Sequence, residues 1–302
     1  MTLPTLLAVL VAAGAIQTDT RSPQTDETIP VSRGARLTLV HFAGEVNVRA
    51  WDRDALRVQA RHASRARVDV QSTPASVRVS ASNARGGIGS VDYEISAPAW
   101  MPVTIEGHYS FVVVEGMQAD VAVETVRGDV SVKGGASISA RSVEGAVAVE
   151  GATRRVIASS VNKGVTVTAA RGDVAAETVN GPIALTRMDA SAVEATTVNG
   201  SITFDGTAAA GSQHRLTTHN GNVTLSLPEN THATFAVRTY NGSFSSALGT
   251  TTHGESTRGR RTLHTVGNGS AAFEIETFSG SIRLRKAGTA ASSPKDPKQH
   301  ER

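Results

Sequence analysis

Thr197-Val198-Asn199-Gly200-Ser201-Ile202 is one copy of a hexad that decides the fold of this chain. The hexad reads Ser or Thr, an apolar residue, any residue, Gly, any residue and an apolar residue. Other copies begin at Thr125, Ser142, Thr178, Thr218, Thr239 and Thr277, and a copy that begins at Ser160 carries one extra residue. A repeat with a period near twenty residues indicates an architecture in which one unit stacks on the next.

Each copy of the hexad contains one glycine. These are Gly128, Gly145, Gly164, Gly181, Gly200, Gly221, Gly242 and Gly280. The spacing is 17 to 21 residues, except that 38 residues, equal to two periods, separate the last two. Four of the glycines follow an asparagine, and Asn-Gly is typical of a sharp chain reversal at positive φ. We therefore expect all eight to be structural turn glycines.

Between the glycines, each unit holds two short runs in which apolar and small polar residues alternate. In one unit these runs are Ile183–Thr186 and Ala195–Val198. Alternation with a period of two predicts half-buried strands, and no stretch after the N-terminus has a helical period. An antiparallel meander is the rival arrangement, because Asn-Gly also favours hairpins. A parallel β-helix-like solenoid is favoured, because stacked identical coils place like residues in ladders.

The predicted domain organisation is one long β-solenoid between two polar ends. Residues 1–15 read as a signal peptide, since the apolar run Leu3–Ile16 is too short to span a bilayer. Residues 16–30 read as a polar linker, 31–286 as the solenoid domain and 287–302 as a disordered tail. Within the domain, 31–115 is an irregular β cap and 116–286 holds coils of about 17–21 residues. The polar stretch Thr250–Arg261 is expected to be a protruding loop.

Composition narrows the possible partners and cofactors. The net charge is +3 over 302 residues, which is too small to indicate nucleic-acid binding. The chain has no cysteine, which excludes disulfides and thiolate metal sites. Aromatic residues make up 4% of the chain and offer few platforms for stacking sugars or bases. We predict no cofactor, no metal and no nucleic-acid partner.

No group of residues in the sequence indicates catalysis. Glu124, Glu144, Glu177 and Glu194 recur along the repeats. They do not share one hexad position, so they read as solvated surface charge and not as a carboxylate dyad. The nine histidines have no metal-ligand spacing, and His219 replaces an apolar hexad residue.

Two Arg-Gly-Asp tripeptides also occur in the chain. They lie at 127–129 and 171–173. The glycine of the first already belongs to the hexad, so chance in a glycine-rich chain explains the tripeptides better than integrin recognition.

The hexad series, the apolar leader and the segment Tyr93–Pro98 resemble the DUF4097 family of bacterial β-strand-repeat proteins. That family is related to the autotransporter adhesin head domain. The resemblance covers approximately Leu37–Leu284, nearly all of the predicted mature chain. It implies a pectin-lyase-like β-solenoid that is exported to the cell envelope, carries an adhesin label and has no known catalytic residues.

Taken together, these features predict a non-enzymatic exported protein, in the periplasm, on the cell surface or secreted. Its expected partner is a protein or glycan of the cell surface or envelope, and no stable membrane span is expected once the leader is removed. One alternative is a carbohydrate-active parallel β-helix enzyme, which needs acidic residues gathered in a groove. Another is a structural β-helix protein that polymerises through bare ends. The sequence specifies neither the ligand nor the oligomeric state.

Overall fold

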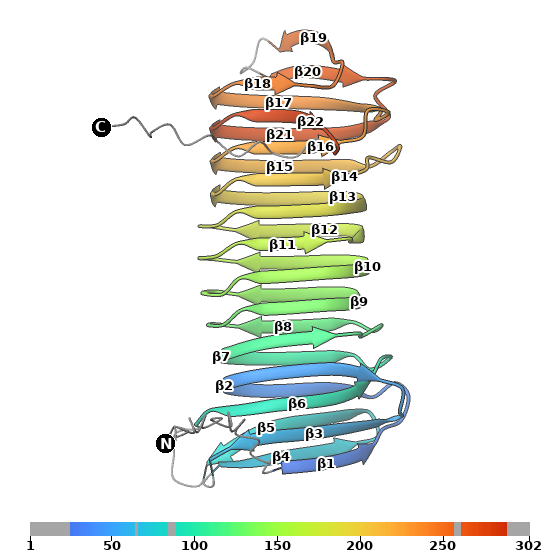
Figure 1. Ribbon diagram of the computed structural model, residues 1–302, viewed down its shortest axis with the longest axis vertical. Coiled ribbons are helices and arrows are strands. Elements are labelled where there is room, and N and C mark those ends of the chain that lie inside the picture. The colour runs from blue at the N-terminus through green and yellow to red at the C-terminus, as the bar shows by residue number, and fades with distance from the viewer. Residues whose placement is uncertain (1–24, 64–65, 84–88, 257–260, 289–302) are drawn as a thin grey trace, which may run out of the picture.

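The computed structural model describes residues 25–63, 66–83, 89–256 and 261–288, which form one straight rod of stacked strands (Figure 1). These residues make 22 strands and no helix, so none of them forms a helix that could cross a membrane. The predicted leader at 1–15 lies outside the described residues, as does nearly all of the predicted tail. The all-β prediction is confirmed.

Parallel pairing joins the central strands into coils. They are β8 (Val121–Thr125), β9 (Val130–Ser142), β10 (Val147–Ser160), β11 (Val165–Thr168), β12 (Arg171–Thr178), β13 (Ile183–Asn199), β14 (Ile202–Gly206), β15 (Gln213–Asn220) and β16 (Val223–Leu227). Val130 pairs with Val147, which pairs with Val165, and the same position continues through Ile183, Ile202 and Val223. The antiparallel meander is therefore wrong for this region, and the chain is a solenoid.

Two sheets face each other across the core of the rod. The first sheet contains the strand segments that end at the Ser or Thr of each hexad. The second sheet contains the segments that begin at the hexad's last apolar residue. Alternate side chains point inward, as Val147 and Val149 do from the second sheet and Val156 and Ala158 from the first, and all four are buried. A core of such small side chains suits two sheets about 10 Å apart.

The glycines of the central coils are required by close packing of one coil on the next. Gly181, Gly200, Gly221 and Gly242 do not have positive φ, so the prediction of positive φ is wrong at these four residues. A Cβ at Gly200 would lie 1.9 Å from the carbonyl oxygen of Gly181, and the other three positions are equally tight. Only glycine lets the backbones approach this closely. Among the eight glycines, only Gly128 and Gly280 have φ between +20° and +160°.

The Ser or Thr that opens each hexad bonds the same carbonyl groups. Thr197 Oγ1 donates to the carbonyl oxygen of Gly181 at 3.0 Å, and Thr218 Oγ1 donates to that of Gly200 at 2.8 Å. These hydroxyls are buried, so the bond satisfies a donor that would otherwise be stranded in the core. In the copy that begins at Ser160 and has one extra residue, the carbonyl group that accepts the equivalent hydrogen bond belongs to Lys163 and not to Gly164.

At the N-terminal end, the coil that comes first in sequence is not the outermost coil. The strands are β1 (Thr25–Pro30), β2 (Arg36–Trp51), β3 (Ala55–His62), β4 (Ala66–Thr73), β5 (Ser76–Asn83), β6 (Val91–Pro98) and β7 (Val103–Glu115). Strand β2 makes a whole coil that pairs with β7 on one side and with β5 and β6 on the other. Antiparallel β1, β3 and β4 lie beyond it.

Two sequence boundaries change at this end. Thr25–Pro30, assigned above to the polar linker, is strand β1 and pairs with β3. The regular coils also begin before residue 116, because His41–Val46 forms a hexad copy with its glycine at Gly44. His41 takes the place of the opening Ser or Thr and bonds Ser110 Oγ through Nδ1 at 2.7 Å.

The C-terminal end repeats the same arrangement. Its strands are β17 (Ala233–Asn241), β18 (Phe244–Ser246), β19 (Thr251–Ser256), β20 (Arg261–Val266), β21 (Ala271–Ser279) and β22 (Ile282–Lys286). Strands β21 and β22 lie between β15 and β16 on one side and β17 and β18 on the other (Figure 1). The last coil is thus inserted between two coils that precede it in sequence.

This insertion overturns two sequence interpretations. The 38 residues from Gly242 to Gly280 are not two stacked periods, because Gly280 packs directly between Gly221 and Gly242. Within the stretch Thr250–Arg261, the prediction of a protruding loop is wrong for Thr251–Ser256, which is strand β19 and pairs antiparallel with β20, whereas residues 257–260 lie outside the described residues. Strand β20 also pairs antiparallel with β17, so β20 and β19 extend the first sheet beyond β17.

Candidate functional site

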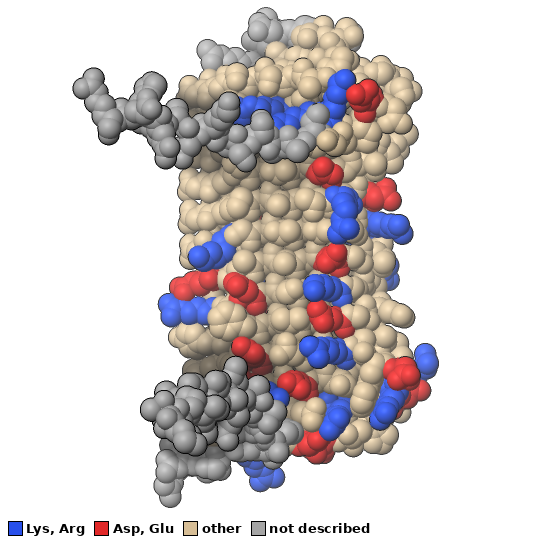
Figure 2. All heavy atoms as spheres, in the orientation of Figure 1, with Lys and Arg blue, Asp and Glu red and all other residues tan. Residues whose placement is uncertain are grey.

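On the outer face of the second sheet, oppositely charged side chains pair with one another. Some of its outward side chains in the central coils are small, as at Ser131, Ala148 and Thr166. Figure 2 shows a column along the rod in which acidic and basic side chains alternate. Ion pairs follow the rod axis: Glu115 Oε1 lies 3.1 Å from Lys133 Nζ, and Glu150 Oε1 lies 3.0 Å from Arg187 Nη2. This face therefore offers little for a ligand.

The first sheet carries a groove of about 570 Å³ on its outer face. Seven neighbouring strands contribute to it: β10, β12, β13, β15, β21, β17 and β20. Its outward-facing lining residues are Arg155, Asp173, Ala175, Ala192, Glu194, Gln213, Arg215, Thr234, Ala236, Arg261, Leu263, Ala272 and Glu274. The groove crosses the strands, so it runs along the rod.

The strand register explains why the surface is hollow here. Asp173, Ala192, Gln213 and Ala272 stand in one row across adjacent strands. Alanines in this row and in the neighbouring row leave space above the sheet, while longer side chains rise beside them. Strand β20, with the half-exposed Leu263, borders the groove at the C-terminal end of the rod. The insertion of β21 next to β15 is what completes the groove.

Charged side chains of both signs line the groove. Glu274 pairs with two arginines, with Oε2 at 3.1 Å from Arg215 Nη2 and Oε1 at 3.8 Å from Arg261 Nη2. Within the part of the chain that the structure describes, Arg155 and Glu194 have no ion-pair partner. The groove can therefore receive a ligand that carries both hydrogen-bond donors and acceptors.

His214 lies beneath the floor of the groove and belongs to the core. Its ring centroid is 4.5 Å from that of Phe273, and its Nε2 bonds Ser212 Oγ at 3.0 Å. Burial lowers the pKa of His214 to about 4, so the imidazole is neutral at physiological pH. No described residue bonds its Nδ1. Because the side chain is only 3% exposed, it is a packing residue and not a group that a ligand could reach.

The glutamates singled out in the sequence lie in three different places. Glu194 lines the groove, and Glu177 borders a neighbouring hollow of about 330 Å³ that Glu194 and Arg141 also line. Glu124 lies on the same face, opposite Arg141. Glu144 lies at the turn edge, where it pairs with Arg127. The structure thus brings Glu177 and Glu194 together, and both are exposed.

The eight predicted turn glycines lie outside the groove. They form a ladder along one edge of the rod, apart from Gly164, which is displaced by Lys163. The sequence does not predict the groove residues as a site, because alanine side chains carry no functional group. Their assembly also depends on the position of β21 between β15 and β17. Of the groove residues, the sequence had drawn attention only to Glu194 and, within the second Arg-Gly-Asp tripeptide, to Asp173.

The arginine and the aspartate of both Arg-Gly-Asp tripeptides are exposed, and side chains of both tripeptides are bonded to other residues of the rod. Arg127 pairs with Glu144, and Asp129 Oδ1 accepts a hydrogen bond from the Ala146 amide at 2.8 Å. In the second tripeptide, Asp173 Oδ1 accepts from Ser191 Oγ at 3.1 Å. Among the described residues, no three His, Asp or Glu side chains are placed to hold a metal ion.

Comparisons with known proteins give one family and several distant structures. A sequence model of the family described as Toastrack DUF4097 matches residues 36–285. The structure of a candidate adhesin from Bacteroides fragilis aligns over 86% of this chain and 96% of its own, with 12% identity and a TM-score of 0.44. That of a candidate cell adhesion protein from Clostridium sporogenes aligns over 87% and 99%, with 10% identity and a TM-score of 0.28. No curated protein matches the chain.

Proposed function

Because this chain belongs to the Toastrack DUF4097 family, we propose that it is an exported, non-enzymatic adhesin-like protein that binds a cell-surface or envelope component along its groove. The groove on the first sheet is the observation that carries this proposal. It is open at the surface, runs along the rod and is lined by side chains of both charges. Such a shape suits an extended polymer better than a compact small molecule.

The lining residues support a way in which such a polymer would be held. Arg155 and Glu194 are free to bond carboxylate, hydroxyl or amine groups, and the exposed Leu263 offers an apolar contact. The ligand we propose is therefore an extended segment of an envelope protein or glycan that lies along several coils. Many weak contacts spread along a rod give affinity through their number, without one deep pocket.

Filling the groove tests this proposal. Ala192→Phe places a bulky side chain on the groove floor. Ala184→Phe places the same side chain on the outer face of the second sheet, at the other end of strand β13. Both alanines face outward and are half-buried. We expect Ala192→Phe to weaken retention on isolated bacterial envelopes and on a glycan array by about tenfold or more. Ala184→Phe should bind as the unmodified protein does.

Equal retention of all three proteins would show that the groove is not the binding site. The carbohydrate-active alternative has one supporting observation, the proximity of Glu177 and Glu194 at the neighbouring hollow. Depolymerisation of a glycan that is lost in Glu177→Gln would replace the non-enzymatic proposal with that alternative. Both carboxylates are exposed on the outer face of the sheet and no deep cleft among the described residues encloses them, so we expect no such activity.

A further inference from the structure

One edge of the rod exposes a row of apolar side chains. They occupy the second position of each hexad and are Phe42, Val126, Val143, Val161, Val179, Val198, Phe278 and Tyr240. Each is between 37% and 42% exposed. His219 holds the same position and stacks on Phe278, with ring centroids 4.8 Å apart. We call this set, with His108 of β7, the apolar row. A continuous apolar row of this length on a surface indicates an interaction site.

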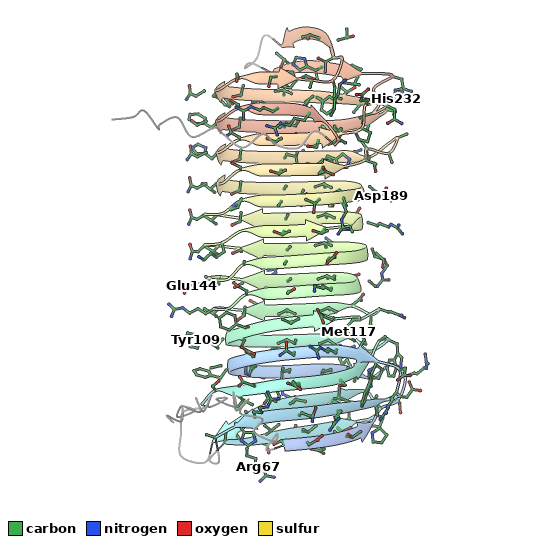
Figure 3. All side chains as sticks on the ribbon, viewed as in Figure 1. Arg67, Tyr109, Met117, Glu144, Asp189 and His232 are labelled. Carbon is green, nitrogen blue, oxygen red and sulfur yellow. The ribbon has the colours of Figure 1, made fainter. Side chains whose placement is uncertain are left out.

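A second row runs beside the first, at the third hexad position. It consists of Ala43, Tyr109, Arg127, Glu144, Asn162, Asn180, Asn199, Asn220, Ser279 and Asn241, and we call it the polar row. Asparagine amides bond along it: Asn199 Nδ2 donates to Asn180 Oδ1 at 3.0 Å, and Asn220 Nδ2 donates to Asn199 Oδ1 at 2.9 Å. In Figure 3, Tyr109 and Glu144 project from this edge. The two rows together form the edge strip.

The order of side chains in the apolar row is nearly palindromic. Along the rod it reads Phe42, His108, Val126, Val143, Val161, Val179, Val198, His219, Phe278 and Tyr240. Aromatic rings thus stand at both ends and valines in the middle. The insertion of β21 before β17 is needed for this order, because it places Phe278 next to His219.

We propose that two copies of this chain pair antiparallel through the edge strip. A two-fold axis across the rods lays the apolar row of one copy on the apolar row of the other, and the polar row on the polar row. A two-fold axis along the rods would instead lay apolar on polar. An isologous interface must be self-complementary, and only the antiparallel arrangement meets this requirement.

The palindrome fixes the register of the pair. With the axis between Val161 and Val179, these two residues face each other across the interface. Further out, Val143 faces Val198, and Phe42 faces Tyr240 at the ends. In the polar row, Glu144 then faces Asn199 and Arg127 faces Asn220, so no like charges meet. A register centred on Glu144 would bring the two copies of that carboxylate together, which is unfavourable.

The size of the strip fits a modest dimer. About ten coils at about 4.8 Å each give a strip about 48 Å long. With a width of about 12 Å it buries about 580 Å² on each copy, or about 1,150 Å² in total, just above the minimum of about 1,000 Å² for a specific interface. The dimer should therefore depend on protein concentration.

A charge at the centre of the strip tests the proposal. Val161→Lys puts two ammonium groups beside the two-fold axis, and Thr166→Lys adds the same charge to the outer face of the second sheet. In sedimentation velocity we expect the unmodified protein and Thr166→Lys to dimerise alike. Val161→Lys should weaken the dimer about tenfold or more while melting at the same temperature. A protein that stays monomeric at every concentration, or equal weakening by both lysines, would overturn the proposal.

Cysteine pairs test the direction and register, since the chain has no cysteine of its own. A disulfide forms only between residues whose Cα atoms lie within about 7 Å. We expect a linked dimer when Phe42→Cys is mixed with Tyr240→Cys and oxidised, and none from either variant alone. Linked dimers that form as readily from Phe42→Cys alone would overturn the antiparallel arrangement. Absence of any link in the mixture would overturn the register.

Discussion

At the scale of single residues, the glycine and the Ser or Thr hydroxyl of each hexad allow one coil to pack closely against the next. The glycine lets the backbone of one coil approach the carbonyl group of its neighbour, and the Ser or Thr three residues earlier bonds that carbonyl group. Both positions are fixed by contact between coils and not by the local turn. This explains why the hexad has a period of one coil.

Adding one methyl group to the glycine ladder should therefore destabilise the rod. In Gly200→Ala the new Cβ lies 1.9 Å from the Gly181 carbonyl oxygen, so the coils must separate. We expect a loss of about 1–3 kcal/mol in the free energy of unfolding. The control is Gly249→Ala, where no atom lies within 4 Å of the new Cβ and φ is not positive. Chemical denaturation measures both, and equal stabilities would refute the packing explanation.

Burial of His214 predicts a pH-dependent stability. The pKa of His214 is about 4 in the folded chain and about 6.5 when unfolded. Between these values the unfolded state binds more protons, so stability falls as the pH drops from about 6.5 to 4. The loss should approach about 3 kcal/mol at most. Denaturation midpoints of His214→Phe should vary less with pH over this range than those of the unmodified protein or of His219→Phe. Identical pH profiles would contradict the assignment.

At the scale of elements, the hexad predicts the strands of the central coils but not the order in which coils stack. Each copy presents the same glycine, hydroxyl and apolar residue to its neighbours. Thr218, Thr239 and Thr277 could each stack on either of the others, so sequence order gave the wrong neighbour for β17. The groove could not be predicted from the hexad for the same reason, because Arg215, Glu274 and Arg261 meet only when β21 lies next to β15. The polar linker was misjudged because β1 has few apolar residues.

Insertion of the last coil predicts slow hydrogen exchange near the C-terminal end of the chain. Strand β21 is paired on both sides, with β15 and β17, whereas β19 pairs with β20 alone among the strands that the structure describes. We expect amides of β21 to exchange as slowly as those of β13, and about tenfold or more slowly than those of β19. Hydrogen exchange followed by mass spectrometry resolves these segments. Fast exchange in β21, as for a fraying last repeat, would contradict the inserted arrangement.

At the scale of the whole molecule, different surfaces of the rod have different properties. One sheet face carries the groove, the other pairs its own charges, and one edge carries the apolar row. In the antiparallel dimer that we propose, the two grooves would lie on the same side of the joined edges. An envelope polymer could then contact both copies at once, which raises the effective affinity without new contacts.

At this scale we predict that the whole protein is exported from the cytoplasm. The apolar run Leu3–Ile16 favours removal of a leader and transport out of the cytoplasm. Fractionation of the native host should place the protein in the periplasm, on the cell surface or in the medium, with an N-terminus near Ile16. Protease treatment of intact cells distinguishes a surface location from a periplasmic one. Cytoplasmic protein that retains Met1 would end the argument for export.

The inserted terminal coils also constrain how such a rod can change its length during evolution. A duplicated coil added after Lys286 would find its natural neighbours already occupied, because β22 lies between β16 and β18. A duplicated coil placed between Val121 and Leu227 needs only the hexad to fit. Genes of this kind can therefore lengthen or shorten the rod from the middle, while both ends are inherited unchanged.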